Sequence, residues 1–275
     1  MKNLLKLKVL ALMLIEIGFV SCDNNDDPMP VDNTITGLAV KNENLKILVQ
    51  ALTRADLATT LKGAGPFTVF APTDAAFTAF LKTTPYATVN DVPKDVLTQI
   101  LLNHVVSGSV KSTALTTTYI KTLAKGSASA TNNLSMYVDV TSGVKLNGVA
   151  NVTTADVMAS NGVIHVVDAV IGLPTVVTHA LANKNFTSLV GALTGSGQPN
   201  FVGTLSGTGS FTVFAPTNAA FTALNTELAP GGIASVSAAN LTKVLQYHVV
   251  SGANVLAATL TEGQIVTPIL TPAQT

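Results

Sequence analysis

The stretch Phe67-Thr-Val-Phe-Ala-Pro-Thr-Asp-Ala-Ala-Phe77 decides the architecture of this chain, because it occurs twice. It returns as Phe211-Thr-Val-Phe-Ala-Pro-Thr-Asn-Ala-Ala-Phe221, at an offset of 144 residues. The shorter block His104-Val-Val-Ser-Gly108 returns as His248-Val-Val-Ser-Gly252 at the same offset of 144 residues. Matched blocks that keep one order and one spacing indicate a duplicated domain.

Helical patterns dominate the first part of each copy. Residues 39–52 place their large apolar side chains at helical spacing, which predicts one helix with an apolar face. Residues 67–70 predict a short strand that ends before Pro72. A further helix is predicted to begin near Pro93, since proline suits the first turn of a helix. Its buried face is predicted to contain Leu97, Ile100 and Leu101.

The pair of residues after each repeated strand predicts a helix N-terminus. In the first copy these residues are Thr73 and Asp74. The side chains of Thr and Asp often cap a helix, because their oxygens accept hydrogen bonds from the free backbone N–H groups of the first turn. Thr217 and Asn218 stand at the matching place in the second copy. The change from Asp74 to Asn218 would remove an acid or base and yet preserve a cap. We therefore interpret all four as structural motif residues.

The pattern changes from helical to alternating in the later part of the first copy. Apolar residues alternate with polar ones at Leu134, Met136, Val138 and Val140. Asn147-Gly148 and Asn161-Gly162 are dipeptides typical of hairpin turns. Residues 163–171 form a nearly continuous apolar run, interrupted by His165 and Asp168, which predicts a strand at the centre of a sheet. Helices followed by hairpins predict an α+β domain.

Residues 1–21 have the pattern of a signal peptide. Lysines precede an apolar run of about a dozen residues, which is too short for a membrane span of about 20 residues. Phe19-Val20-Ser21-Cys22 resembles the lipobox of bacterial lipoproteins, so the single cysteine, Cys22, is the expected site of lipid attachment. The alternative is an ordinary secretory peptide that leaves Cys22 as a free thiol.

The rest of the chain divides into a tether and two domains. Residues 22–34 are acidic and rich in Asn and Pro, which predicts a flexible tether. Residues 35–173 are expected to form a complete first domain, and residues 174–275 a second domain without counterparts of residues 134–171. We expect either that the sequence is a fragment of a longer chain, or that a partner supplies the strands by exchange or addition.

Composition argues against nucleic acids, metals and catalysis. The formal net charge is zero and Arg54 is the only arginine, so the chain lacks the basic stripes that bind phosphates. Four scattered histidines and one cysteine give no metal-ligand spacing, and no cofactor is expected. The sequence contains neither Gly-x-Ser-x-Gly nor His-Glu-x-x-His. We therefore expect a protein that is not an enzyme.

The repeated block resembles the first signature of the fasciclin (FAS1) domain family, and residues 162–170 resemble its second signature. Asn103-His104 and Tyr247-His248 lie where that family has its Tyr-His motif. The resemblance implies tandem FAS1 folds, each a wedge-like β-sandwich of two sheets with a helical layer. It also implies an extracellular setting and a role in adhesion or matrix association. Asn103 departs from the family's Tyr, and the second copy lacks the second signature.

The Tyr-His motif has a structural and a functional interpretation. His104 and His248 lie on the apolar faces of predicted helices, where an imidazole most often bonds backbone groups, because an unpaired buried polar group costs about 1–3 kcal/mol. His165, between apolar strand residues, has the same structural interpretation. The functional interpretation follows from the family resemblance, which links the region of Asn103 and Tyr247 to cell adhesion.

These patterns predict a non-catalytic lipoprotein of the outer membrane that faces the cell surface or the periplasm. Its expected partner is a protein or a glycan on another cell surface or in a matrix, and only the lipid anchor meets the membrane. The incomplete second domain adds self-association as an expectation. The alternative function is a carbohydrate- or small-ligand-binding lipoprotein, which would need exposed aromatic platforms; the chain has four tyrosines and no tryptophan.

Overall fold

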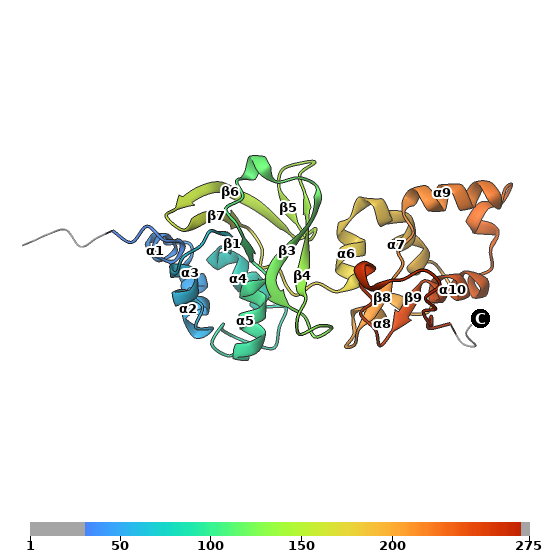
Figure 1. Cartoon of the computed structure of the whole chain (residues 1–275), viewed down its shortest axis with the longest axis horizontal. Coiled ribbons are helices and arrows are strands. Elements are labelled where there is room, and N and C mark those ends of the chain that lie inside the picture. Colours follow the sequence, from blue (N-terminus) through green and yellow to red (C-terminus); the bar gives the residue numbers. More distant parts are fainter. Residues whose placement is uncertain (1–30, 271–275) are drawn as a thin grey trace, which may run out of the picture. The chain divides into compact units, whose positions relative to one another are not determined.

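The computed structural model of the chain describes residues 31–270 (Figure 1). The predicted signal peptide, Cys22 and residues 23–30 of the predicted tether lie outside the described residues. Within residues 31–270, no helix combines the length and the apolar character that crossing a membrane requires.

Five α-helices of the first domain share one apolar core with three of its strands, β1 (Phe67–Pro72), β2 (Val105–Ser107) and β7 (Gly162–Val167). The helices are α1 (Ile35–Lys41), α2 (Lys46–Arg54), α3 (Ala58–Lys62), α4 (Asp74–Leu81) and α5 (Lys94–Leu102), and a 3-10 turn, η1 (Ser112–Ala114), follows them. Pro93 is the N-cap of α5, and Leu97, Ile100 and Leu101 are buried on that helix, so the helix predicted near Pro93 is confirmed.

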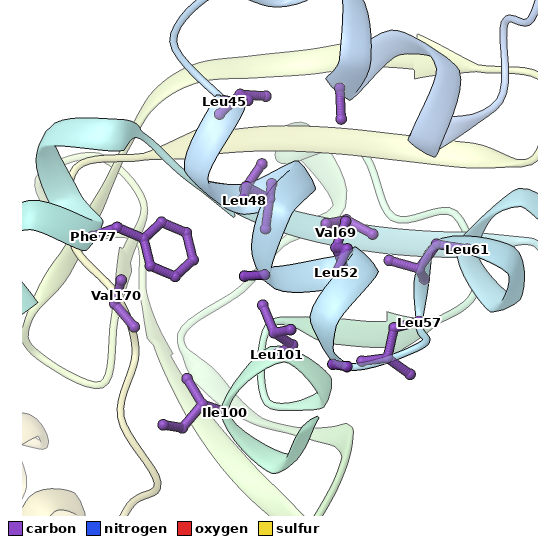
Figure 2. Packing of buried hydrophobic residues seen from close by; sticks show 14 of the residues in the cluster. Leu45, Leu48, Leu52, Leu57, Leu61, Val69, Phe77, Ile100, Leu101 and Val170 are labelled. Carbon is purple, nitrogen blue, oxygen red and sulfur yellow. The ribbon is translucent and has the colours of Figure 1, made fainter. Parts of the chain in front are cut away.

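The single helix predicted for residues 39–52 is wrong, because the structure has a break between α1 and α2. Asn42 ends α1, and its backbone N–H donates to the carbonyl oxygen of Ala39. The Asn42 side chain accepts a hydrogen bond from the N–H of Asn44 at 3.0 Å. A local side-chain bond of this kind competes with helical hydrogen bonding. Leu45, Leu48 and Leu52 still face the core, as Figure 2 shows.

Seven strands of the first domain form one sheet, in the order β2-β1-β7-β6-β5-β4-β3. They are β1 (Phe67–Pro72), β2 (Val105–Ser107), β3 (Thr118–Lys125), β4 (Asn133–Asp139), β5 (Lys145–Leu146), β6 (Ala150–Ala159) and β7 (Gly162–Val167). β7 is parallel to β1 and antiparallel to β6, and every residue of β7 is buried. The predicted central strand is therefore confirmed, although it ends at Val167 and residues 168–171 continue without strand pairing.

The sheet bends over to enclose a second core, which produces the layers of a sandwich. β6 shifts its register against β7 in two places, and Asp156 within it has a φ of 59°. Bulges of this kind bend a strand and increase its twist. As a result, Phe70 and Val167 from one part of the sheet pack with Met136 and Leu146 from another. The predicted α+β fold with a helical layer is confirmed, with its two layers joined as parts of one sheet.

The alternating pattern of residues 134–140 indicated a strand, and β4 confirms it, although burial does not alternate in the second half of that strand. Met136, Tyr137, Val138 and Asp139 are all buried. Successive residues of a strand point to opposite faces, so a run of four buried residues means that both faces of β4 are covered there.

The first predicted hairpin turn is confirmed, and the second is displaced by one residue. Asn147 and Gly148 have φ values of 47° and 71° and lie in the connection from β5 to β6. β6 ends at Ala159 and β7 begins at Gly162, so residues 160–161 form the second turn. A Cβ on Gly162 would lie 2.0 Å from the carbonyl oxygen of Phe67, so only glycine fits at the start of β7.

The second domain repeats the helical part of the first. Its α-helices are α6 (Val176–Ala182), α7 (Thr187–Leu193), α8 (Phe201–Ser206), α9 (Asn218–Glu227) and α10 (Ala238–Tyr247), with 3-10 turns η2 (Lys184–Phe186), η3 (Gly232–Ser235) and η4 (Ala257–Thr259). β8 (Phe211–Val213) pairs with β9 (Val249–Ser251) in the register that β1 keeps with β2. Within the described residues β8 has no second neighbour, whereas β1 has β7 on its other edge.

Candidate functional site

His104 follows α5 and is enclosed in the first domain, with 2% of its surface exposed. Its Nδ1 lies 2.8 Å from the carbonyl oxygen of Ile100, and its Nε2 lies 2.8 Å from the backbone nitrogen of Ile171. Because a carbonyl only accepts and a backbone N–H only donates, the proton is on Nδ1 and the ring is neutral. Burial lowers the pKa of His104 to about 4, against the opposing effect of the bond to Ile100.

Asn103, in the place of the family's Tyr, is also fully buried. Its Nδ2 donates to the carbonyl oxygens of Ile171 at 3.3 Å and Gly172 at 3.0 Å. Its Oδ1 accepts from the hydroxyl of Thr122 in β3 at 3.2 Å. Asn103 and His104 thus act together to fix the segment that follows β7. Both side chains are committed to the interior, which agrees with the structural interpretation of the motif.

Thr73 and Asp74 serve two different helices. The Thr73 hydroxyl accepts from the N–H of Ala76 at 3.2 Å and caps α4, while the Thr73 N–H donates to Val167 at the end of β7. The Asp74 carboxylate accepts from the N–H of Ile47 at 2.7 Å, so it caps the start of α2. Asp74 lies only in the first turn of its own helix. The sequence indicated a capping residue here, but it gave no sign that Asp74 would cap a helix that precedes it in the chain.

The second domain repeats this arrangement with an amide. The Thr217 hydroxyl accepts from the N–H of Ala220 at 3.4 Å and caps α9. The Asn218 Oδ1 accepts from the N–H of Ser188 at 2.9 Å at the start of α7, and its Nδ2 donates to the carbonyl oxygen of Lys184 at 2.9 Å. The exchange of Asp for Asn therefore keeps the acceptor that the neighbouring helix needs.

His165 and Asp168 serve the centre of the sheet. The Nε2 of His165 lies 2.9 Å from the carbonyl oxygen of Val110, and its Nδ1 accepts from the N–H of Asp156 at 3.2 Å. The ring also stacks on Phe70. Asp168 is exposed, and its carboxylate accepts from the backbone and side-chain nitrogens of Asn151 at 2.7 and 2.8 Å. Both ring nitrogens of the buried His165 are therefore hydrogen-bonded. The Asp168 carboxylate connects the end of β7 to the start of β6 through its hydrogen bonds to Asn151.

A Ser-Asp-His group that sequence reasoning missed lies beside β7. The Asp156 carboxylate accepts from the backbone N–H of Ser112 at 2.7 Å and from its hydroxyl at 2.5 Å, and these bonds lower the pKa of Asp156. The Asp156 carboxylate is 4.0 Å from the His165 ring. Since the hydroxyl bonds to the carboxylate and not to the imidazole, the group does not have the order of a nucleophile and its base. No sequence signal marks it, because the left-handed backbone of Asp156 arises from the bulge in β6.

The Tyr-His motif of the second domain is exposed to solvent, whereas the matching residues of the first domain are buried. Tyr247 is 53% exposed and His248 is half-buried. The Nδ1 of His248 lies 2.8 Å from the carbonyl oxygen of Val244, as in the first domain. The described residues provide no hydrogen-bond partner for its Nε2. Only the second domain therefore presents its motif to solvent.

No group of three or more His, Cys, Asp or Glu side chains within residues 31–270 is arranged to hold a metal ion. The polar motif residues described above bond mainly to backbone atoms, and their geometry maintains the contacts of β1, β7, α2 and α5. In the first domain, these polar side chains stabilise the interior through hydrogen bonds to backbone groups.

The fasciclin domain model matches the chain over residues 43–174 and again over residues 184–274. The chain therefore belongs to the fasciclin domain family, a family of modules known for adhesion and protein interaction. The two matched ranges agree with the duplicated pattern of the sequence and with the two helical halves of the structure.

Two similar proteins come from Synechocystis sp.. The protein sll1483 is 42% identical over 139 residues, which are 50% of this chain and 72% of that protein. The protein sll1735 is 38% identical over 137 residues, 50% of this chain and 96% of that protein. A fasciclin-like arabinogalactan protein of Arthroderma benhamiae is 33% identical over 117 residues, 42% of this chain and 26% of that protein.

Among solved structures, the chain is similar to a FAS1 domain pair from the insect cell adhesion molecule fasciclin I. The two share 17% sequence identity with a TM-score of 0.43, over 80% of this chain and 72% of the other.

Proposed function

We propose that this protein is a non-catalytic interaction module, anchored by a lipid at Cys22, that mediates adhesion to another cell surface or to a matrix. One observation carries the proposal. His104, the histidine of the Tyr-His motif in the first domain, is buried and has both ring nitrogens hydrogen-bonded to backbone atoms. A ring in this state has neither the access nor the free nitrogen that a general base requires.

Binding through the surface of a rigid domain is consistent with these contacts. Asn103, His104 and Thr73 all fix the segment around β7, so the family motifs of the first domain determine shape. A module of fixed shape loses little conformational entropy on binding, which favours its use as an adhesive surface. Two such modules on one anchored chain also gain avidity when both reach the same target.

The proposed location rests on the sequence of residues 1–34. The signal pattern, Cys22 and the acidic tether support export, acylation and an outer-membrane anchor with the domains held away from the lipid. Labelling of cells with radioactive palmitate tests the anchor. The wild-type protein should carry the label and sediment with membranes, whereas Cys22→Ser should lose both properties. Protease treatment of intact cells then reports whether the domains face outwards or the periplasm.

The adhesive function is tested with a strain that lacks the gene. Aggregation and attachment to a matrix-coated surface should fall in the deletion strain and return with the wild-type gene, but not with Cys22→Ser expressed at an equal level. Unchanged aggregation and attachment on deletion would contradict the proposal. A glycan array with the purified protein separates the alternative, since selective glycan binding without an adhesion defect would favour a carbohydrate-binding lipoprotein.

A further inference from the structure

A hollow in the first domain lies between α2, α4 and the loop of residues 82–89 that follows α4. Its volume is about 540 Å³, within the range of about 300–1,000 Å³ that is common for sites of small organic ligands. The residues that line it all belong to the first domain, and none of them lies in a strand. We call this feature the helical hollow.

Part of the lining of the helical hollow is apolar. Ile47 of α2, Leu81 of α4 and Tyr86 of the loop are half-buried and pack against the core of the first domain. The described residues provide no hydrogen-bond partner for the Tyr86 hydroxyl. An aromatic ring has partial negative charge on its face, so the C–H groups of a sugar ring can pack on it favourably. Tyr86 therefore supplies an aromatic platform inside the hollow.

Three threonines of the lining present oxygen atoms that act as acceptors. The hydroxyls of Thr78 and Thr84 each donate to a backbone carbonyl oxygen of the preceding turn at 2.8 Å. The Thr88 hydroxyl donates to the Asp91 carboxylate at 2.8 Å. A hydroxyl has one proton to donate, and its oxygen has two lone pairs. Since each proton is already used, these oxygens accept from a ligand, and the ligand must bring hydrogen-bond donors such as hydroxyl groups.

Gln50 and Lys82 supply donors to the helical hollow. Both residues are exposed, and the described residues give neither side chain a hydrogen bond or an ion pair. Among the described residues that line the hollow, Lys82 is the only charged one. The carboxylate of Asp91, further along the loop, is outside the lining and accepts from the N–H and hydroxyl of Thr88. The positive charge of Lys82 therefore favours an anionic ligand.

The second domain has a hollow at the matching place, with a volume of about 400 Å³. It lies between α7, α9 and the segment from η3 to α10. Four of its lining positions match positions that line the helical hollow. Ser188, Gly191, Asn225 and Ile233 stand where the first domain has Ile47, Gln50, Leu81 and Val89. The duplication thus provides an internal comparison for the groups of the lining.

The groups with ligand-binding chemistry are absent from the second domain. Gly191, Thr226 and Pro230 stand in place of Gln50, Lys82 and Tyr86. The structural contacts of the same region are kept, since Asp74 and Asn218 cap the matching helices α2 and α7. The helical part of the domain therefore forms without these three groups, which indicates that in the first domain they serve a ligand.

We propose that the helical hollow of the first domain binds a uronic acid residue of an acidic polysaccharide. The sugar ring packs its C–H face on Tyr86, and its hydroxyl groups donate to the threonine oxygens. Its carboxylate accepts from the Lys82 ammonium and the Gln50 amide. The rest of the polysaccharide extends into solvent from the exposed side of the hollow. This inference rests on the proposed function, because it names the matrix component that the module binds.

Other anions suit the lining less well. A phosphate group is usually held by arginine or by several cations, whereas the described lining offers one lysine and no arginine. A fatty acid would leave the threonine oxygens without donors, which costs free energy when water is displaced. A ligand with several hydroxyl groups, one apolar face and one carboxylate uses all the groups of the lining, and a uronic acid has this combination.

Isothermal titration calorimetry tests the proposal on the mature chain carrying Cys22→Ser. The probes are tetrasaccharides of galacturonate, mannuronate and guluronate, and at least one of them should bind saturably. The methyl ester of that probe has the same rings without the charge, so it should bind about tenfold more weakly. Hydrogen exchange at residues 82–89 should slow when the probe is bound, because these residues form one wall of the hollow.

Variants of the exposed lining residues locate the binding without disturbing the core. Lys82→Gln should weaken binding of the probe about three- to tenfold through the loss of a charge-assisted hydrogen bond. Lys125→Gln is the matched control, because it removes the same charge from an exposed residue of β3 in the same domain and should leave binding unchanged. Gln50→Ala should weaken binding about three- to tenfold through the loss of its hydrogen bonds.

Variants of Tyr86 test the aromatic platform. Tyr86→Ala should weaken binding at least about tenfold, whereas Tyr86→Phe keeps the ring and should weaken binding about threefold or less. Because Tyr86 packs against the core, circular dichroism and the thermal midpoint establish that Tyr86→Ala is folded. The exposed Gln50 and Lys82 variants test the same site independently of this packing.

Two results would overturn this inference. One is that none of the three tetrasaccharides binds, and the other is that the probe binds Lys82→Gln and Gln50→Ala as tightly as it binds the wild type. In either case a deletion strain with an adhesion defect would still support the proposed function, through another surface of the protein. Binding of the probe at the hollow without an adhesion defect on deletion would support the site and contradict the adhesive function.

Discussion

The Ile171 backbone N–H donates to the Nε2 of His104 at 2.8 Å, across 67 residues of sequence. His104 follows α5 and Ile171 follows β7, so this bond ties the helical layer to the central strand. The Nδ1 of the same ring donates to Ile100, and the ring is therefore held neutral by two backbone groups. Protonation of Nε2 would make it a hydrogen-bond donor that faces the Ile171 N–H, which is also a donor, so this hydrogen bond would be lost.

Stability should depend on pH through His104. Its pKa is about 4 in the folded protein and 6.5 for the free side chain, so the unfolded chain takes up the proton first as pH falls. The contribution of the neutral ring is fully present above pH 6.5 and is lost as pH falls towards 4. A shift of this size corresponds to about 3 kcal/mol between pH 7 and pH 4. Urea unfolding of wild type and His104→Gln at both pH values isolates this contribution, because the carboxylates titrate in both proteins. Equal losses in the two proteins would show that His104 does not titrate on unfolding.

Asn103→Ala should destabilise the first domain by about 2–3 kcal/mol, because it removes the donor to Ile171 and Gly172 and the acceptor for Thr122 in the interior. Tyr247→Ala, at the matching position of the second domain, should change stability by about 0.5 kcal/mol or less, since that side chain is 53% exposed. Urea unfolding followed by circular dichroism measures both. A comparable loss in the two variants would mean that the two motifs are equally structural.

Gly162→Ala should prevent the close approach of β7 to β1. Its Cβ would meet the Phe67 carbonyl oxygen at 2.0 Å, and its φ is 154°. We expect a loss of about 3 kcal/mol or more, seen as a lower thermal midpoint or as insoluble protein. Gly172→Ala is the control, because no atom lies within 4 Å of its Cβ and its φ is not in the left-handed region. A soluble Gly162→Ala protein with an unchanged midpoint would contradict the tight fit.

The capping contact of Asp74 should survive as an amide. Asp74→Asn keeps an oxygen for the N–H of Ile47 and should cost less than about 1 kcal/mol, whereas Asp74→Ala should cost about 0.5–2 kcal/mol. The reverse exchange, Asn218→Asp, loses the donor to Lys184 but keeps the acceptor for Ser188. Thermal unfolding of the three variants ranks them. If Asp74→Asn were as unstable as Asp74→Ala, the charge of Asp74 would matter more than its oxygen.

The local features of the fold followed from the sequence. The repeated blocks indicated two domains, Pro93 and the apolar spacing after it indicated α5, and the run that follows Gly162 indicated a buried central strand. Each of these predictions depends on the spacing of apolar residues or on the backbone preference of one residue type. Both properties can be read directly from the amino-acid sequence. For the same reason the Asn147-Gly148 turn was predictable, since positive φ favours these two residues.

Contacts between distant segments were decided only by the tertiary structure. Asp74 caps α2, which precedes it by 27 residues at the bonded Ile47, and a bulge at Asp156 bends the sheet so that its layers remain joined. The second domain has the same apolar spacing as the first, yet its Val244 and Phe214 are half-exposed. The spacing of apolar residues therefore does not tell whether another segment covers them. Periodicity tells which face of an element avoids water, whereas the identity of its neighbour depends on which strands meet in space. The sequence therefore predicted that His104 bonds backbone groups in the interior, whereas only the tertiary structure identified Ile171 as a partner.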